Sequence, residues 1–330
     1  MLLRSSIDIC PKEIARGLRG YFNGLLKVCA MPVTRKRKTR LADDDLLGAH
    51  VSTAGGVASA IDRACAIGCA GMQIFVKNNM QWFAKPLDAA EARGFREHPR
   101  RGSLRFVFGH SGYLINLAAN DRALHKMSLR SLREELVRAS LLGLPFLVLH
   151  PGAHMGRGVE AGLEQVVASL DAIHAEIPET RTRIALETTA GQGSSLGRAF
   201  EELAFILRGC REPERLCVCI DTAHLFAAGY ELGDAEGIVR TFAQFEEVIG
   251  FNRLAAFHLN DSKTAGGSRV DRHEHIGKGK IGLDAFRYIM REPRFRSIPK
   301  VLETPKGKDM AEDVVNLATL RSLLQESVNT

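Results

Sequence analysis

The sequence lacks the features of a membrane protein and of a disulfide-bonded fold. No apolar run approaches the ~18 residues that a membrane-spanning helix needs. The seven cysteines form no spaced framework and include no CxxC pair, which argues against a thiolate zinc site and favours a reducing, intracellular compartment. With 45% hydrophobic and 25% charged residues among 330, the composition is that of a globular protein long enough for one large α/β domain.

Net charge is also scarce outside the first 44 residues. The formal net charge is +7, and residues 1–44 account for six of these positive charges because they hold ten basic and four acidic residues. The high isoelectric point is therefore no evidence that the rest of the chain binds nucleic acid. We predict a basic, disordered extension over 1–44, whose run at 35–40 leaves nuclear or organellar targeting open, and a catalytic domain over 45–330.

From Leu46 onward, short apolar runs alternate with segments of helical periodicity such as Leu129, Leu132 and Leu136. The runs predict strands near residues 47–51, 72–76, 105–110, 145–150, 183–187, 216–221, 254–258 and 299–303. Eight alternations predict an α/β fold, a (β/α)8 TIM barrel with its active site at the C-terminal strand ends. A doubly wound open sheet is the alternative, and it would bind ligands at a single switch point.

Six of these runs end in an imidazole or a carboxylate. The side chains are those of His110, His150, Glu187, Asp221, His258 and Glu303. Any one of them, taken alone, is more often structural, but nothing structural requires ionisable residues at the same end of six strands. His224 follows Asp221 by three positions, and Asp271 and His273 flank Arg272 at a spacing of two, which puts both on one side of an extended loop.

These five imidazoles and four carboxylates exceed the needs of one metal ion, because a catalytic zinc takes three protein ligands and keeps one position open. Nitrogen and oxygen ligands suit three zinc ions that share a bridging carboxylate, with manganese or iron as other occupants. Two ions about 3.5–4 Å apart supply a nucleophile and bind both reacting oxygens of a phosphoryl displacement. The pattern predicts metal-dependent hydrolysis of a phosphate ester, and His50, also at a strand end, is expected to orient a ligand or water.

Eight ordered motifs then match one family over essentially the whole chain after the extension. They lie at residues 48–52, 110–117, 150–152, 187–193, 219–224, 258–261, 267–273 and 302–304. The chain resembles endonuclease IV, the zinc-dependent apurinic/apyrimidinic (AP) endonuclease of base excision repair. All nine ligand positions of that family carry the expected residue types.

The resemblance implies three zinc sites and a DNA-repair reaction. The implied ligands are His110, His150 and Glu187 for the first ion, Glu187, Asp221, His258 and Glu303 for the second, and His224, Asp271 and His273 for the third. A hydroxide between the first two ions would attack the phosphorus 5′ to an abasic site in duplex DNA, leaving a 3′-hydroxyl and a 5′ deoxyribose phosphate. The family also trims blocked 3′ ends. We therefore expect a monomeric, DNA-associated, intracellular enzyme whose partner is damaged double-stranded DNA, with no membrane and no organic cofactor.

Loops after the second and third strands are the expected DNA contacts, together with Arg272 between two ligands. The candidates are Lys77, Asn78, Met80, Gln81, Tyr113, Leu114 and Arg272. Apolar side chains such as Met80 and Tyr113 would fill the gap that an extruded nucleotide leaves in the base stack. Here the chain departs from the family, which often carries a basic residue at the position of Met80 and a glutamine at that of Asn79.

Two other functions are weighed against this one. A sugar isomerase or epimerase on a metal-dependent TIM barrel needs one or two metals and about four ligands, so the third set of His224, Asp271 and His273 argues against it. A catalytically silent lesion-binding protein would keep metals only for folding. The complete ligand set argues against that function too, since structural sites are usually closed.

Overall fold

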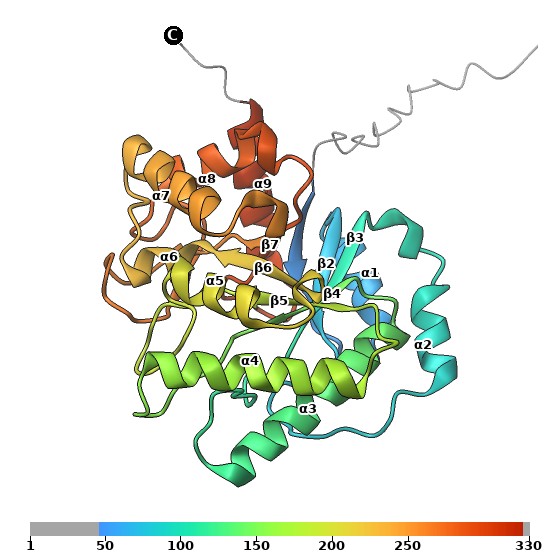
Figure 1. Cartoon of the computed structure of the whole chain (residues 1–330). Helices are drawn as coiled ribbons and strands as arrows, with labels where there is room; N and C mark the ends of the chain where they lie inside the picture. Colours follow the sequence, from blue (N-terminus) through green and yellow to red (C-terminus); the bar gives the residue numbers. More distant parts are fainter. Residues whose placement is uncertain (1–45, 326–330) are drawn as a thin grey trace, which may run out of the picture. The chain divides into compact units, whose positions relative to one another are not determined.

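The computed structural model describes residues 46–325, so the predicted extension over 1–44 lies outside the described residues. Eight strands form a closed parallel barrel (Figure 1). They are β1 (Leu47–His50), β2 (Gly71–Phe75), β3 (Phe106–His110), β4 (Phe146–Leu149), β5 (Arg183–Glu187), β6 (Leu216–Asp221), β7 (Leu254–His258) and β10 (Lys300–Leu302). Strand β10 closes the ring by pairing with both β7 and β1. The TIM-barrel prediction is confirmed, and the doubly wound alternative is wrong.

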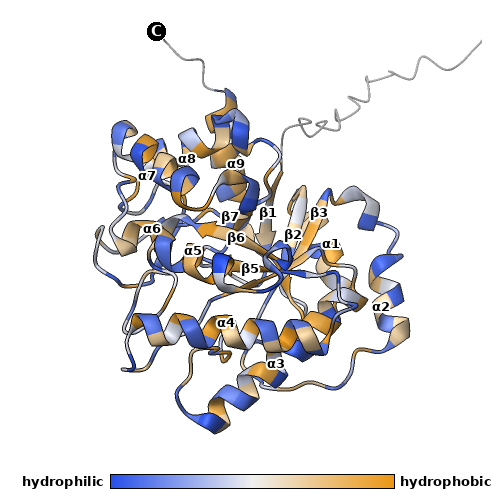
Figure 2. Ribbon diagram, viewed as in Figure 1, coloured by the Kyte–Doolittle hydropathy of each residue, from blue (hydrophilic) through white to orange (hydrophobic). Residues whose placement is uncertain are grey.

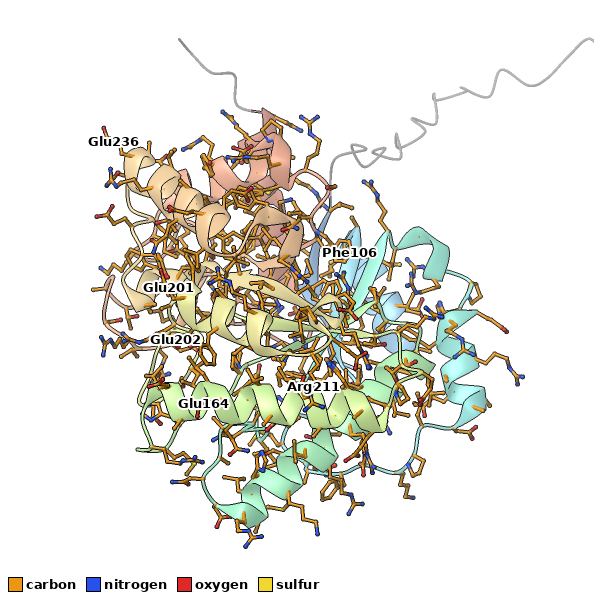
Figure 3. The ribbon with its side chains drawn as sticks, viewed as in Figure 1. Phe106, Glu164, Glu201, Glu202, Arg211 and Glu236 are labelled. Carbon is orange, nitrogen blue, oxygen red and sulfur yellow. The ribbon has the colours of Figure 1, made fainter. Side chains whose placement is uncertain are left out.

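Helices surround the strands in the order that a (β/α)8 barrel requires (Figure 1). They are α1 (Ser59–Ala66), α2 (Ala89–Arg96), α3 (Arg122–Leu141), α4 (Val159–Glu176), α5 (Phe200–Gly209), α6 (Thr222–Ala228), α7 (Ala235–Val248), α8 (Leu283–Arg291) and α9 (Ala311–Gln325). Figure 2 shows largely apolar strands and helices that carry both apolar and polar residues. Figure 3 shows charged side chains of these outer helices, among them Glu164 on α4 and Glu236 on α7, both of which are exposed. The apolar core thus lies between the helices and the barrel.

Bulky side chains fill one part of the barrel interior. The rings of Phe108 and Phe146 stack with centroids 4.6 Å apart, and Phe106 stacks on Phe108. Gly71 makes room for Phe106, because a Cβ there would lie 2.4 Å from a ring atom. The aromatic layer leaves the C-terminal end of the barrel to the polar residues that follow on the same strands.

One small sheet was not predicted. Strands β8 (Asp261–Ser262) and β9 (His273–Glu274) pair antiparallel in the long connection between β7 and α8. The buried carboxylate of Asp261 accepts hydrogen bonds from four backbone N–H groups between residues 262 and 281, at 2.8–3.0 Å. This hairpin and its carboxylate anchor bring Asp271 and His273 back toward the strand ends.

Candidate metal centre

The predicted ligands face the barrel interior because of the two-residue period of the strands. Ala185 and Cys219 belong to the interior cluster, so Glu187 and Asp221, two residues further along, point the same way. The side chains that gather at this end include all six predicted from the strand ends: His110, His150, Glu187, Asp221, His258 and Glu303. Ionisable side chains at these strand positions therefore lie close to one another at the C-terminal end of the barrel.

Glu187 is the hub of the cluster and is fully buried. Its Oε2 lies 3.1 Å from His110 Nε2 and 2.9 Å from His150 Nε2, while its Oε1 lies 2.7 Å from His258 Nδ1. Histidines therefore contact both oxygens of one carboxylate from different sides. This arrangement suits a carboxylate that bridges two metal ions.

A second group forms around His258. Its Nδ1 lies 3.3 Å from Glu303 Oε2 and 3.9 Å from Asp221 Oδ2. One potential ligand atom each from Glu187, Asp221, His258 and Glu303 falls within 4.8 Å of the others. The four side chains are the set expected for the second ion.

The third group differs in one respect from the expectation. Asp271 lies between two imidazoles, with its oxygens 3.2 Å from His224 Nε2 and 3.2 Å from His273 Nε2. Asp221 Oδ2 also lies 3.7 Å from His273 Nε2, and Asp221 joins His224 and His273 in a group of potential ligands within 4.8 Å. Asp221 is therefore shared between two groups, as Glu187 is.

Backbone carbonyls set the orientation of three imidazoles. The Nδ1 atoms of His110, His224 and His273 lie 2.7, 2.8 and 3.2 Å from the carbonyl oxygens of Ser111, Thr188 and Glu303. Each ring thereby turns its Nε2 toward the carboxylates. The buried Nε2 atoms of His224 and His273 make no well-formed hydrogen bond although carboxylates surround them, which is the environment that a cation would complete.

Charges in the cluster are strongly coupled. Burial alone would lower the pKa of His224, but the charges of Asp221 and Asp271 outweigh it and raise the pKa to about 10. Burial alone would raise the pKa of Glu187, but His258 and the other imidazoles hold it well below its usual range. Without metal, protonated His224 and His258 thus neutralise neighbouring carboxylates, and a bound cation would replace those protons.

Two buried amides also belong to the cluster, and the sequence patterns missed them. Gln73 and Asn260 are both fully buried and contact ligand-type side chains, with Asn260 Nδ2 donating to Asp221 Oδ2 at 2.6 Å. Gln73 is a polar residue at an interior position of an otherwise apolar β2, which was the available signal. The expected supporting residue, His50, lies with its Nδ1 3.0 Å from Glu303 Oε1.

A cleft of about 430 Å³ opens beside the cluster. His150, His224 and Asp271 line it together with Tyr113 and Arg272. The remaining lining comes from the loops after β3, β4 and β5, with small or polar residues such as those at 152–153 and 189–195. The cleft therefore gives a ligand direct access to two of the three groups.

Comparison with known proteins decides the family. A family model described as the xylose isomerase-like TIM barrel matches residues 61–323. The probable endonuclease 4 of Trichlorobacter lovleyi is 48% identical over 84% of this chain and 99% of that protein. The protein of the same name from Chloroflexus aurantiacus is 49% identical over 84% of this chain and 98% of its own length. The crystal structure of endonuclease IV from Thermus thermophilus matches with a TM-score of 0.74 at 35% identity, over 85% of this chain and 99% of that one.

The chain belongs to the endonuclease IV family. Likeness to sugar epimerases shows the fold alone: a D-tagatose 3-epimerase-like protein superposes with a TM-score of 0.63 at 18% identity. None of the helices among residues 46–325 is long and apolar enough to cross a membrane.

Several DNA-contact candidates of this endonuclease IV homologue lie on exposed loops. Met80 and Tyr113 are 67% and 54% exposed, and Asn78, Gln81 and Arg272 are exposed too. Leu114 is half-buried. The Asn78 side chain accepts a hydrogen bond from the Met80 backbone N–H at 2.9 Å, a turn that presents Met80 outward.

Lys77 departs from the expectation of a DNA contact. Its side chain is 2% exposed and its Nζ lies 2.9 Å from Oε1 of Glu135 on α3, whose side chain is 0% exposed. The other Glu135 oxygen accepts from the backbone N–H of Gly112 at 2.9 Å, and Lys77 Nζ donates to the carbonyl of Gln81. Lys77 therefore ties the loops of Met80 and Tyr113 together.

Proposed function

We propose that the chain hydrolyses the phosphodiester 5′ to abasic sites in duplex DNA, leaving a 3′-hydroxyl and a 5′ deoxyribose phosphate, and that it also trims blocked 3′ ends. One observation carries this proposal: Glu187 and Asp221 are each shared between groups of ligand-type side chains beside an open cleft. The names of the relatives support the same reaction class. We assign residues 45–330 to the catalytic domain and 1–44 to an N-terminal extension.

Three zinc ions are the proposed cofactors. The residues that would hold them are His110, His150 and Glu187, then Glu187, Asp221, His258 and Glu303, then His224, Asp271 and His273 with Asp221 close by. Such ions lower the pKa of a coordinated water to ~7 and stabilise negative charge on phosphoryl oxygens.

The chain itself orients the substrate. Arg272 lies exposed beside the cleft, with its guanidinium hydrogen-bonded to the Asp271 carbonyl, where it meets the phosphate backbone. Tyr113 packs edge-on against Phe75 with centroids 5.3 Å apart, and from this position it fills a gap in the base stack beside Met80. Extruding a nucleotide costs a few kcal/mol, and least where no base pair exists, so an abasic site is the favoured substrate. The proposed partner is damaged duplex DNA, bound by a monomer.

The test uses a duplex with one stable abasic-site analogue and the purified, zinc-loaded protein. We expect a nick that a strong chelator abolishes and whose upstream end a polymerase extends directly. A folded, zinc-containing protein that leaves the duplex intact would overturn the proposal and favour the isomerase or silent-binder functions. Isomerisation of a panel of ketoses would then separate these two.

Glu187→Gln tests the hub of the cluster. Losing the charge that faces three imidazoles should lower kcat by more than ~100-fold, beyond the 10–100-fold loss typical of residues that only orient ligands. DNA binding should persist, because Glu187 is fully buried. Glu202→Gln is the matched control, since Glu202 is also buried and its Oε2 accepts from Gly197 N–H, a bond that glutamine preserves. Unimpaired cleavage by Glu187→Gln would remove this residue from the mechanism.

A further inference from the structure

Gln73 is a buried amide with both ends engaged in the candidate metal centre. It lies on the interior face of β2 and is 0% exposed. Its Oε1 lies 2.7 Å from His258 Nε2, and its Nε2 donates to Glu303 Oε1 at 2.5 Å. The same Nε2 lies 2.7 Å from His50 Nδ1. One side chain thus bridges two members of the second ligand group.

His258 depends on this amide in a way that the other oriented imidazoles do not. His110, His224 and His273 are each held by a backbone carbonyl, which substitutions of side chains do not remove. The ring of His258 is reversed, because its Nδ1 faces Glu187 and its Nε2 faces Gln73. Its orientation therefore rests on a side chain.

The hydrogen-bonding pattern allows one orientation of the amide. If His258 Nδ1 is to bind a cation, the ring proton must be on Nε2, and this N–H needs an acceptor. The Gln73 carbonyl oxygen is that acceptor, which leaves the NH2 group facing the Glu303 carboxylate, where a donor is required. The amide thus accepts a hydrogen bond from His258 and donates one to Glu303.

We propose that Gln73 is a positioning residue that sets the tautomer of His258 and the direction of Glu303 for one particular metal ion. The inference rests on the proposed zinc centre. Histidine ligands generally donate their second ring nitrogen to a partner that orients them, and loss of that partner weakens metal binding by about 10–100-fold. The effect should be confined to one ion, because Asp221 is oriented separately by Asn260 Nδ2 at 2.6 Å.

The experiment measures zinc release. Protein loaded with zinc is mixed with an excess of a chromophoric chelator, and the phases of release are counted and timed for wild type, Gln73→Met and Gln73→Glu. Methionine removes both hydrogen bonds at similar length. Glutamate keeps an acceptor for His258 but turns a second carboxylate toward Glu303. Gln165→Met is the matched control, because Gln165 also contacts a histidine, His125 at 3.2 Å, on helices outside the cluster.

We expect one ion to leave about 10–100-fold faster from both Gln73 variants, with the other two unchanged. kcat for the abasic duplex should fall while KM stays within twofold, and both variants should give the far-UV circular dichroism spectrum of wild type. Gln165→Met should release zinc as wild type does. Release within twofold of wild type in both Gln73 variants would overturn the inference, as would equal acceleration of all ions. Wild type that retains no zinc would instead refute the proposed function.

Discussion

The buried ion pair between Lys77 and Glu135 offers a sharp test of how the two proposed DNA-contact loops are held. Lys77→Met removes the cation and leaves the Glu135 carboxylate with the Gly112 N–H at 2.9 Å and a distant Ser131 hydroxyl at 3.4 Å. Glu135→Leu leaves the ammonium group with the Gln81 carbonyl but without its carboxylate. Each single substitution therefore leaves one buried charged group without its oppositely charged partner.

The expected cost follows from that burial. Breaking a buried pair by removing one partner costs about 3–5 kcal/mol, and both side chains here are at most 2% exposed. Lys77→Met should fall at the lower end, because burial already raises the pKa of Glu135 despite the lysine and the stranded carboxyl can take up a proton. The double variant removes both charges, so its loss should fall short of the sum of the single losses by at least ~2 kcal/mol.

Two measurements decide the role of Lys77. Equilibrium denaturation at pH 7 gives the three stability changes, and the salt dependence of binding to an abasic duplex reports phosphate contacts. We expect the slope of log K against log salt to be unchanged in Lys77→Met. A phosphate contact would instead reduce the magnitude of that slope by about 0.9. A stability loss below ~1 kcal/mol together with a reduced slope would show that Lys77 binds DNA and that the ion pair does not hold the loops.

Three further outcomes are expected. Met80→Arg should add one phosphate contact and steepen the salt slope by about 0.9, and an unchanged slope would place Met80 away from the backbone. Burial lowers the pKa of His174 to about 4 from 6.5, so the free energy of unfolding should fall as the pH drops from 6.5 toward 4. In His174→Phe, the midpoint of urea unfolding should fall less over the same pH range. A pH profile identical to that of wild type would refute the assignment. Gly279→Ala should loosen the 263–282 loop and cost the protein one bound zinc, because the added Cβ would lie 2.4 Å from Asp261 Oδ1. Gly102→Ala is the control, since a Cβ at that position would meet no atom within 4 Å. Full zinc retention by Gly279→Ala would contradict the expectation.

The barrel and the interior direction of its ligands follow from local patterns in the sequence. Each strand keeps a period of two, so Glu187 lies on the same face as Ala185 and Asp221 on the same face as Cys219, wherever the strands sit. Eight such strands, each followed by a helical segment or long connection, have few alternatives to a closed parallel barrel. The ligand types, their strand-end positions and the family resemblance are thus all properties of short segments and their order.

Which side chains meet across the barrel depends instead on register, rotamers and loop paths that no short segment determines. The sequence predicts that Lys77 is an exposed cation at the rim of the barrel, but the packing of α3 buries it against Glu135. Asp221 lies near His273 only because the β8–β9 hairpin folds back over the barrel. Gln73 reaches His258, which is 185 positions away in the chain, because both face the same interior. Sequence order therefore determined the fold and the types of ligand-forming side chain. The tertiary structure decided which of these side chains come together in one group, which residues orient them, and which charges are buried.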